Sequence, residues 1–463
     1  MSEQAEHIIR LLKRYAICIG GVIVASCLAP YLWELEHSLT SQHLVSFPDA
    51  YRPLHILRPY LAIAALYLPA LGAFIYAQFC GILDRYIIRQ QIGMFLIILT
   101  GFVVIWALLE VQNTHGDFGD REGTGGIILQ YYLVQIPQLL VALSPFVLLL
   151  TTLFTLGKLS QFRELIGMIQ TGRGFFRIVA PIAGVAVFTS LTLGILNYHW
   201  APSGQAQRAG LKDLAKYDSL TRARNVLYYH QETDRLWYVG LFPKDYFQGA
   251  PLQHVEITTK KDGALVSRLR AESASWDHQS GTWTLTNVSE LDLQHPIAPR
   301  YKPQQKSLTL TDWPETPSQL ISPGLEPTTL GIPELQDWIA TNSDVDWIDQ
   351  QPYETQFHAR ISKPWMGLIT SLLAAPLGVI YSRKGAVGGI IFALVLCLLL
   401  FFFTEMFIAF GNGGYMPPFL AAWSAELIFG GLACILMYRR SQNLSIYQIM
   451  KKVMLLWSGV KHR

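Results

Sequence analysis

The sequence carries little charge for its length. Only 15% of its 463 residues are charged and 51% are hydrophobic, whereas soluble domains average about 25% charged residues. The shortage lies in the two flanks, because residues from about 201 to about 353 have an ordinary soluble composition. We therefore expect membrane segments at both ends and one water-exposed domain between them. A net charge of +3 is too small to indicate a nucleic-acid-binding protein.

Cysteines and catalytic motifs are also scarce. The five cysteines lie in or beside apolar runs and none lies in the central segment: Cys18, Cys27, Cys80, Cys397 and Cys434. This distribution argues against a disulfide framework or a cysteine metal site. Gly157-Lys158 lacks the upstream glycine and the following Ser/Thr of a nucleotide-binding loop, and no GxSxG, HExxH or CxxC sequence occurs. We expect no catalytic residues, metal or cofactor in this chain.

Eight apolar segments qualify as membrane spans, which take about 20 mostly apolar residues. They cover residues 15–33, 60–80, 94–109, 128–156, 175–198, 365–381, 388–410 and 417–438. The third is short and is expected to begin nearer Ile87, and the sixth is marginal in length. The N-terminal run is long and lacks a small-residue cleavage site, so we interpret it as a retained anchor.

Basic clusters predict the orientation of the spans. With eight crossings, the clusters at Arg10/Lys13/Arg14, Arg85/Arg89, Lys158/Arg163/Arg173/Arg177, Arg383/Lys384 and Arg439/Arg440 all fall on one side. Arg52 and Arg58, between the first two spans, are the exception. Because basic loops stay in the cytoplasm, both termini are predicted to be cytoplasmic. The central domain is then outside, in the periplasm of a cell with two membranes.

The central segment shows strand patterns. Short runs rich in aromatic and β-branched residues alternate with Gly/Asp turns, at residues 225–230, 235–240, 264–273, 282–288 and 306–311. Several short strands at this spacing predict an all-β sandwich or jelly-roll. About 150 residues can bury a core of their own.

One cytoplasmic segment, GKLSQFRELIGMIQTG at residues 157–172, is amphipathic. Leu159, Phe162, Ile166 and Ile169 fall at i, i+3, i+7 and i+10, which predicts a helix with one apolar face. Such a helix lies along the membrane surface or docks into a groove of a partner. Periodicity alone leaves both interpretations open. A second amphipathic segment predicts a helix on the cytoplasmic leaflet. Its apolar residues are Ile446, Ile449, Met450, Val453 and Trp457, and its basic residues are Lys451, Lys452, Lys461 and Arg463.

Four ionisable residues stand alone in or near the spans. Acids within a membrane are functional candidates, and a helix-end side chain that reaches the headgroups is the alternative. We favour that alternative for Glu110, and for Glu405 and Glu426 both interpretations stay open. His358 has no clustered partner for a metal, so we interpret it as a hinge residue.

From about residue 82 to about residue 440, the sequence resembles the LptF/LptG (YjgP/YjgQ) permeases of lipopolysaccharide export. The similar pieces occur in the family's order: LDRYIIRQ (83–90), LSPFVLLLTTLFTLGKLSQFRELIGMIQTG (143–172), RLWYV (235–239), AESASWD with GTWTLTNV (271–288), HARISKPW (358–365) and GGYMPPFLAAWSAELIF (413–429). Each piece is weak alone, but the ordered set, with six spans split three and three around a β domain, is specific. LDRYI is closer to the LptG type.

The resemblance implies five regions. Residues 1–81 are an N-terminal extension with two spans, and residues 82–199 hold core spans 1–3 with a cytoplasmic coupling helix at 158–170. Residues 200–357 form a periplasmic β-jelly-roll domain, residues 358–440 hold core spans 4–6, and residues 441–463 form a basic tail.

The resemblance also implies partners and contact residues. In this family two related permeases pair in the bacterial inner membrane above a dimeric cytoplasmic ABC ATPase, which uses the ATP. The ATPase-coupling residues would be Leu159, Gln161, Phe162, Arg163, Glu164, Leu165 and Met168. Glu164 aligns with the family's coupling-helix glutamate and would contact a basic group. The β domain would receive the acyl chains of lipopolysaccharide, or of a related glycolipid, and pass the lipid to a periplasmic bridge protein.

The sequence departs from the family in three places, and other functions stay open. The first two spans lie outside the family core, the segment 110–122 is net acidic where some members are basic, and the tail is longer. A secondary transporter would show inverted repeats and polar groups within its spans, and we find no repeat. A membrane enzyme with a periplasmic site needs a clustered nucleophile, base or metal set, which the spacing does not show. A membrane scaffold is a third alternative.

Overall fold

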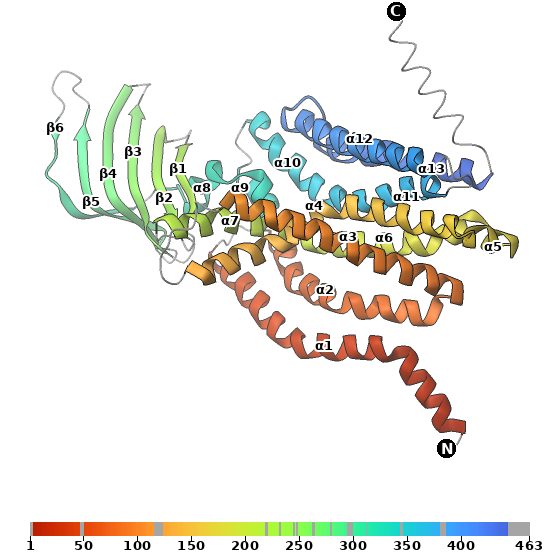
Figure 1. Ribbon diagram of the computed structural model, residues 1–463. Helices are drawn as coiled ribbons and strands as arrows, with labels where there is room; N and C mark the ends of the chain where they lie inside the picture. Colours follow the sequence, from red (N-terminus) through yellow and green to blue (C-terminus); the bar gives the residue numbers. More distant parts are fainter. Residues whose placement is uncertain are drawn as a thin grey trace, which may run out of the picture.

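The computed structural model describes residues 3–46, 51–114, 124–217, 221–230, 233–243, 246, 249–261, 264–277, 280–293, 300–311, 313–342, 346–379 and 386–442. A bundle of long helices occupies one end of the molecule and an antiparallel sheet the other (Figure 1). The predicted combination of membrane helices with an inserted β domain is therefore confirmed.

Seven helices in the described part of the chain are long and apolar enough to cross a membrane. They are α1 (Glu3–Ser46), α2 (Arg52–Phe79), α3 (Ile82–Thr114), α4 (Thr124–Gln161), α6 (Phe175–Tyr198), α12 (Ala386–Asn412) and α13 (Pro418–Ser441). The 33 residues of α3 correspond to roughly 50 Å at 1.5 Å per residue. The apolar interior of a bilayer is about 30 Å thick, so α3 extends beyond it.

The sixth predicted span differs from the prediction. It corresponds to α11 (Met366–Gly378), which has 13 residues and is too short to cross alone. It continues α10 (Trp347–Ser362) through the 3₁₀ turn η4 (Lys363–Trp365), and this segment runs from the sheet end toward the opposite end of the bundle (Figure 1). Nearly all of α11 is buried. Hydropathy does not distinguish such a buried core helix from a lipid-facing one, which explains the prediction of eight full spans.

The core of the bundle forms around α11. Leu373 and Leu377 of α11 pack in one cluster with Leu153 of α4, Leu400 of α12 and Phe429 of α13. The backbones of α11 and α4 approach closely, because a Cβ on Gly378 would lie 3.4 Å from Leu153 Cα.

The sheet is a seven-stranded antiparallel meander. Its strands are β1 (Thr221–His230), β2 (Arg235–Pro243), β3 (Leu252–Lys261), β4 (Ala264–Asp277), β5 (Thr282–Asp292), β6 (Arg300–Tyr301) and β7 (Gln305–Leu310). The order is β1-β2-β3-β4-β5-β6, and β7 also pairs with β5. All five predicted strands are present, whereas β3 and β6 were not predicted.

The described strands form a single sheet with helices beside it, so the jelly-roll arrangement stays a prediction. From β1 to β6, strands that follow one another in sequence pair with one another in the sheet, and β7 pairs with β5. Four helices also lie within residues 200–357: α7 (Trp200–Tyr217), α8 (Pro317–Ile321), α9 (Ile332–Thr341) and most of α10. Trp237, Phe242 and Trp283 of the sheet are fully buried together with Leu320 and Ile321 of α8. The short helices were missed because the strand patterns dominate the segment.

The first two helices form a hairpin that is tied to the rest of the chain near the sheet. Arg58 pairs with Glu36 at 2.6 Å, which joins α2 to α1. The Trp200 indole N–H donates to the same Glu36 carboxylate at 3.0 Å. His55 Nε2 lies 2.5 Å from Asp337 Oδ2 of α9, and the side chain of His55 is almost completely buried. The hairpin is therefore attached to both α7 and α9.

Candidate functional site

The predicted coupling segment lies at the end of the bundle opposite the sheet (Figure 1). The prediction of one helix over residues 158–170 is wrong, because the segment is divided between two helices. α4 ends at Gln161 and α5 (Glu164–Gln170) begins after a two-residue turn. Arg163 adopts a left-handed backbone conformation with φ of 60°, which costs a non-glycine residue about 1–2 kcal/mol. The peptide N–H of Arg163 bonds to the Ser160 carbonyl instead of continuing the α-helical ladder.

The break divides the predicted apolar face in two. Leu159 is fully buried, whereas Phe162, Ile166 and Ile169 are 62%, 37% and 37% exposed. The left-handed turn rotates α5 relative to α4, so the i, i+3, i+7 spacing no longer defines a single face. The segment has one apolar face directed into the protein and a second at the surface.

The inward face is packed among the membrane helices. Leu159, Leu165 and Met168 belong to one buried cluster with Ile87 of α3 and Ile178 of α6. Ala375 of α11 and Met437 of α13 complete it. Burial of such a side chain contributes about 1.5–3 kcal/mol, so α5 is firmly seated on the ends of five longer helices.

The exposed side of the turn carries charge. Gln161 and Arg163 are exposed and Glu164 is partly exposed. The Tyr86 hydroxyl of α3 donates a hydrogen bond of 2.8 Å to Glu164 Oε2. A carboxylate at the surface is thus held at the first residue of α5, where a negative charge also suits the helix dipole.

An ion-pair cluster around one buried carboxylate lies next to this turn. Asp84 of α3 accepts from Arg173 at 2.9 Å and from Arg177 at 3.2 Å, and its side chain is only 6% exposed. The two arginines belong to the α5–α6 connection and to the first turn of α6. The cluster therefore fixes the chain that leaves α5 against the start of α3. Sequence reasoning missed both Asp84 and Tyr86, and the basic cluster that contains Arg173 and Arg177 was the usable signal.

The isolated ionisable residues have different surroundings. Glu110 is buried and pairs with Arg208 of α7 at 2.7 Å, so its interpretation as a side chain reaching the headgroups is wrong. Glu405 is exposed and lies 3.2 Å from Lys363. Glu426 is buried, and neither carboxylate oxygen has a hydrogen-bond partner among the described residues.

His358 lies edge-on to the Phe419 ring, with centroids 5.6 Å apart. Among the described residues, no group of three or more His, Cys, Asp or Glu side chains is placed to hold a metal ion. The predicted tail helix (446–457) and most of the acidic segment 110–122 lie outside the described part of the chain.

Long apolar helices, interrupted once by a water-exposed sheet, define a multi-pass membrane protein with an inserted β domain. Comparison with known families shows which kind of membrane protein this chain is. The chain belongs to the family described as lipopolysaccharide export system permease LptF/LptG, whose family model matches residues 85–439. The resemblance stated from the sequence motifs is therefore confirmed.

Two curated relatives match over nearly their whole length. They are the lipopolysaccharide export system permease proteins LptG of Escherichia coli strain K12 and of E. coli O6:H1 strain CFT073. Each is 24% identical over 374 residues, which cover 78% of this chain and 99% of the relative. The helices α1 and α2 lie outside the residues that the family model matches.

Proposed function

We propose that this chain is a lipopolysaccharide export permease of the bacterial inner membrane, driven through α5 by a separate cytoplasmic ABC ATPase. It would work beside a second, related permease and have no ATPase activity of its own. The coupling role is supported by the α4–α5 turn, which has one buried side and one exposed side. One side is buried against five helices, and the other presents Phe162, Ile166 and Ile169 with Glu164 beside them.

The exposed side has the chemistry of a docking helix. Three apolar side chains on a short element at the end of the bundle are suited to a hydrophobic groove. The adjacent Glu164 carboxylate would pair with a basic group at the edge of that groove, since charge-assisted hydrogen bonds are the strongest of their kind. The hydrogen bond from Tyr86 restricts this carboxylate before any partner binds.

The buried side of the turn would transmit the movement. Interiors are close-packed and resist local compression, so a displacement of α5 must shift the helices that enclose Leu165 and Met168. These include α3 and α6, which reach toward the sheet end of the molecule, and α11, which continues α10 from that side (Figure 1). Movement of the ATPase could in this way change the space between the spans and expel a lipid toward the sheet.

The sheet would accept the lipid and pass it on. In the described part, β1 pairs only with β2 and β7 only with β5, so each has one side without a described strand partner. Open strand edges recruit strands from other proteins. The β5–β7 side lies farthest from the bundle (Figure 1), where a periplasmic bridge protein could extend the sheet.

Co-purification of complexes tests the coupling assignment. Glu164→Arg places a positive charge against the basic group proposed on the ATPase, so the ATPase should no longer purify with the membrane-inserted permease pair. Gln170→Arg adds the same side chain at an exposed position of α5 and leaves Glu164 intact. This control should retain the ATPase. Retention by Glu164→Arg would contradict the coupling role, and isolation of the wild-type chain without a permease or ATPase partner would contradict the proposed function.

A further inference from the structure

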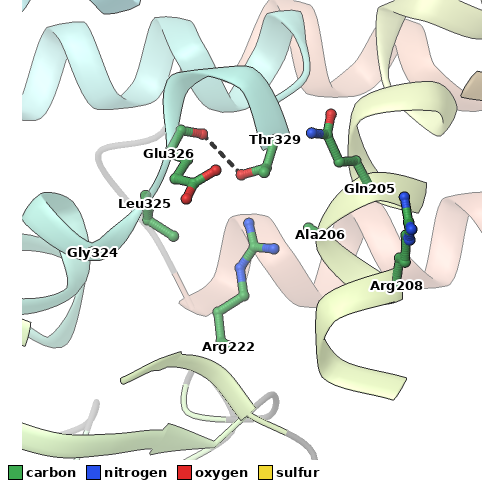
Figure 2. A pocket seen from close by; sticks show the side chains of 8 residues that line it. All are labelled: Gln205, Ala206, Arg208, Arg222, Gly324, Leu325, Glu326 and Thr329. Carbon is green, nitrogen blue, oxygen red and sulfur yellow. Dashed lines mark hydrogen bonds between the residues drawn. The ribbon is translucent and has the colours of Figure 1, made fainter. Parts of the chain in front are cut away.

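A half-open recess lies between the helix bundle and the sheet. It has a volume of about 350 Å³ and is lined by Gln205, Ala206 and Arg208 of α7, Arg222 of β1, and Gly324 to Glu326 with Thr329 from the 3₁₀ turns η2 (Ser322–Gly324) and η3 (Pro327–Thr329) (Figure 2). Small-molecule sites begin at about 300 Å³. The recess therefore has the size of a site for a small polar group.

Two arginines line the recess, but only one has its charge compensated. Arg208 donates to Glu110 at 2.7 Å and to the Tyr131 hydroxyl at 2.9 Å. Arg222 is partly buried and forms no hydrogen bond or ion pair with the described residues. Its guanidinium extends from β1 toward the turns that carry Glu326 and Thr329 (Figure 2). An unpaired, partly desolvated guanidinium is unfavourable and is a strong donor for a phosphate or carboxylate.

The remaining lining supplies hydrogen-bonding groups of both kinds. Gln205 offers a donor and an acceptor and Glu326 offers acceptors. Figure 2 shows the Glu326 carboxylate on the same side of the recess as the Arg222 guanidinium, and Thr329 Oγ1 already donates to the Glu326 carbonyl at 2.8 Å. Donors, acceptors and the small apolar surfaces of Ala206 and Leu325 suit the hydroxyls and ring face of a sugar. An acyl chain would desolvate both charges without compensation.

The recess lies where the chain passes from the spans to the sheet. α7 is the direct chain link from α6 to β1, and it packs closely on α4, because a Cβ on Gly204 would overlap the Val134 carbonyl oxygen. Arg208 reaches from the recess to α3 and α4. A lipid that leaves the bundle for the sheet would pass this point.

We propose that the recess binds the acidic saccharide head of the transported lipid. Arg222 pairs with a phosphate or carboxylate on the sugar, and Gln205, Glu326 and Thr329 bind sugar hydroxyls. This inference rests on the proposed function for the identity of the lipid, but the binding chemistry is testable without transport.

The test measures binding of soluble probes to the full chain in nanodiscs. The probes are glucosamine 1-phosphate, glucuronic acid, glucosamine and inorganic phosphate. Wild type should bind the two acidic sugars more tightly than glucosamine or phosphate, and Arg222→Gln should weaken their binding about tenfold or more. Arg222→Lys keeps the charge and should recover part of the affinity. Arg224→Gln removes the same charge from an exposed position on β1 outside the recess and should bind as wild type does.

Three results would overturn the inference. Equal binding of inorganic phosphate and the sugar phosphate would indicate a site for free phosphate. Equal losses in Arg222→Gln and Arg224→Gln would indicate a diffuse charge effect. Failure of wild type to bind either acidic sugar would exclude the site.

A second measurement separates this inference from the proposed function. ATP-dependent release of lipopolysaccharide by the complete complex should be slowed in Arg222→Gln and unchanged in Arg224→Gln. Release at the wild-type rate in Arg222→Gln would overturn the recess while the permease function stands. Absence of release in wild type, with binding of the acidic sugars intact, would instead contradict the permease function.

Discussion

At the scale of single residues, the hydrogen bond between Tyr86 and Glu164 can be tested most directly. Tyr86→Phe removes a single hydrogen bond of 2.8 Å between partly exposed groups, so the free energy of unfolding should change by less than about 1 kcal/mol. The carboxylate loses its fixed position, and lipid-stimulated ATP hydrolysis by the complex should fall several-fold. Tyr86→Phe should be milder than Glu164→Arg. Wild-type stimulation in Tyr86→Phe would show that the hydrogen bond does not position the carboxylate.

Asp84 should matter for stability more than for docking. Removal of one partner of a buried ion pair leaves the other charge uncompensated, at a cost of about 3–5 kcal/mol. Arg177 is largely exposed and Arg173 is partly exposed, so we expect Asp84→Asn to lower the free energy of unfolding by about 1–3 kcal/mol. Thermal unfolding in detergent measures this loss.

The ion pair between Asp84 and Arg173 provides a control for this prediction. Arg173→Gln removes one charge from the same cluster, and the double variant Asp84→Asn/Arg173→Gln should lose less than the sum of the single variants. Strict additivity would show that the two side chains contribute independently.

The turn between α4 and α5 is the first feature at the scale of an element. Arg163 has a left-handed backbone, which glycine adopts without strain and a β-branched residue resists. Arg163→Gly should therefore keep the turn and raise stability by up to about 1 kcal/mol, whereas Arg163→Ile should destabilise it. Thermal unfolding in detergent measures the stabilities of the two Arg163 variants. Lys158→Gly and Lys158→Ile, which make the same changes within α4, are the controls. A higher stability for Arg163→Ile than for Arg163→Gly would mean that the helix is continuous.

The α1–α2 hairpin is the second such element. Asp337 of α9 contacts His55 and also accepts from the Tyr51 peptide N–H at 2.7 Å. Asp337→Asn weakens both contacts, so amide hydrogen exchange should speed up at the start of α2 and in α9. Asp349→Asn removes an exposed carboxylate from α10 and should leave that exchange unchanged. Equal protection in both variants would show that this contact does not attach the hairpin.

Patterns in the sequence predicted the helices and strands better than they predicted how these elements pack against one another. The strands at β1, β2, β4, β5 and β7 follow from local side-chain alternation and turn residues, which act within a few positions. The buried state of α11 depends on α4, α12 and α13, which are distant in sequence. The strained conformation of Arg163 depends on packing of Leu165 and Met168 in a tertiary cluster, and no periodicity reveals it. The predicted coupling residues therefore lie around one turn but on two helices, with some buried and some exposed, and their contact with an ATPase stays a prediction.

At the scale of the whole molecule, the two ends of the bundle have different chemistry. The α5 end exposes apolar side chains beside the Glu164 carboxylate. The opposite end carries the sheet (Figure 1), with a recess lined by two arginines beside it. The close-packed helices between them give a physical connection from one end to the other. The added hairpin contacts α7 and α9 through Glu36 and Asp337, so it stabilises the junction between the spans and the sheet.

ATP-dependent extraction of lipopolysaccharide tests the account most directly. Proteoliposomes that contain this chain, its paired permease and the ATPase are loaded with lipopolysaccharide, and its release to a soluble periplasmic acceptor is followed with and without ATP. We predict release that requires ATP, that is abolished by Glu164→Arg and that persists in Gln170→Arg. Release at the wild-type rate from Glu164→Arg, or none from the wild-type complex, would contradict the account.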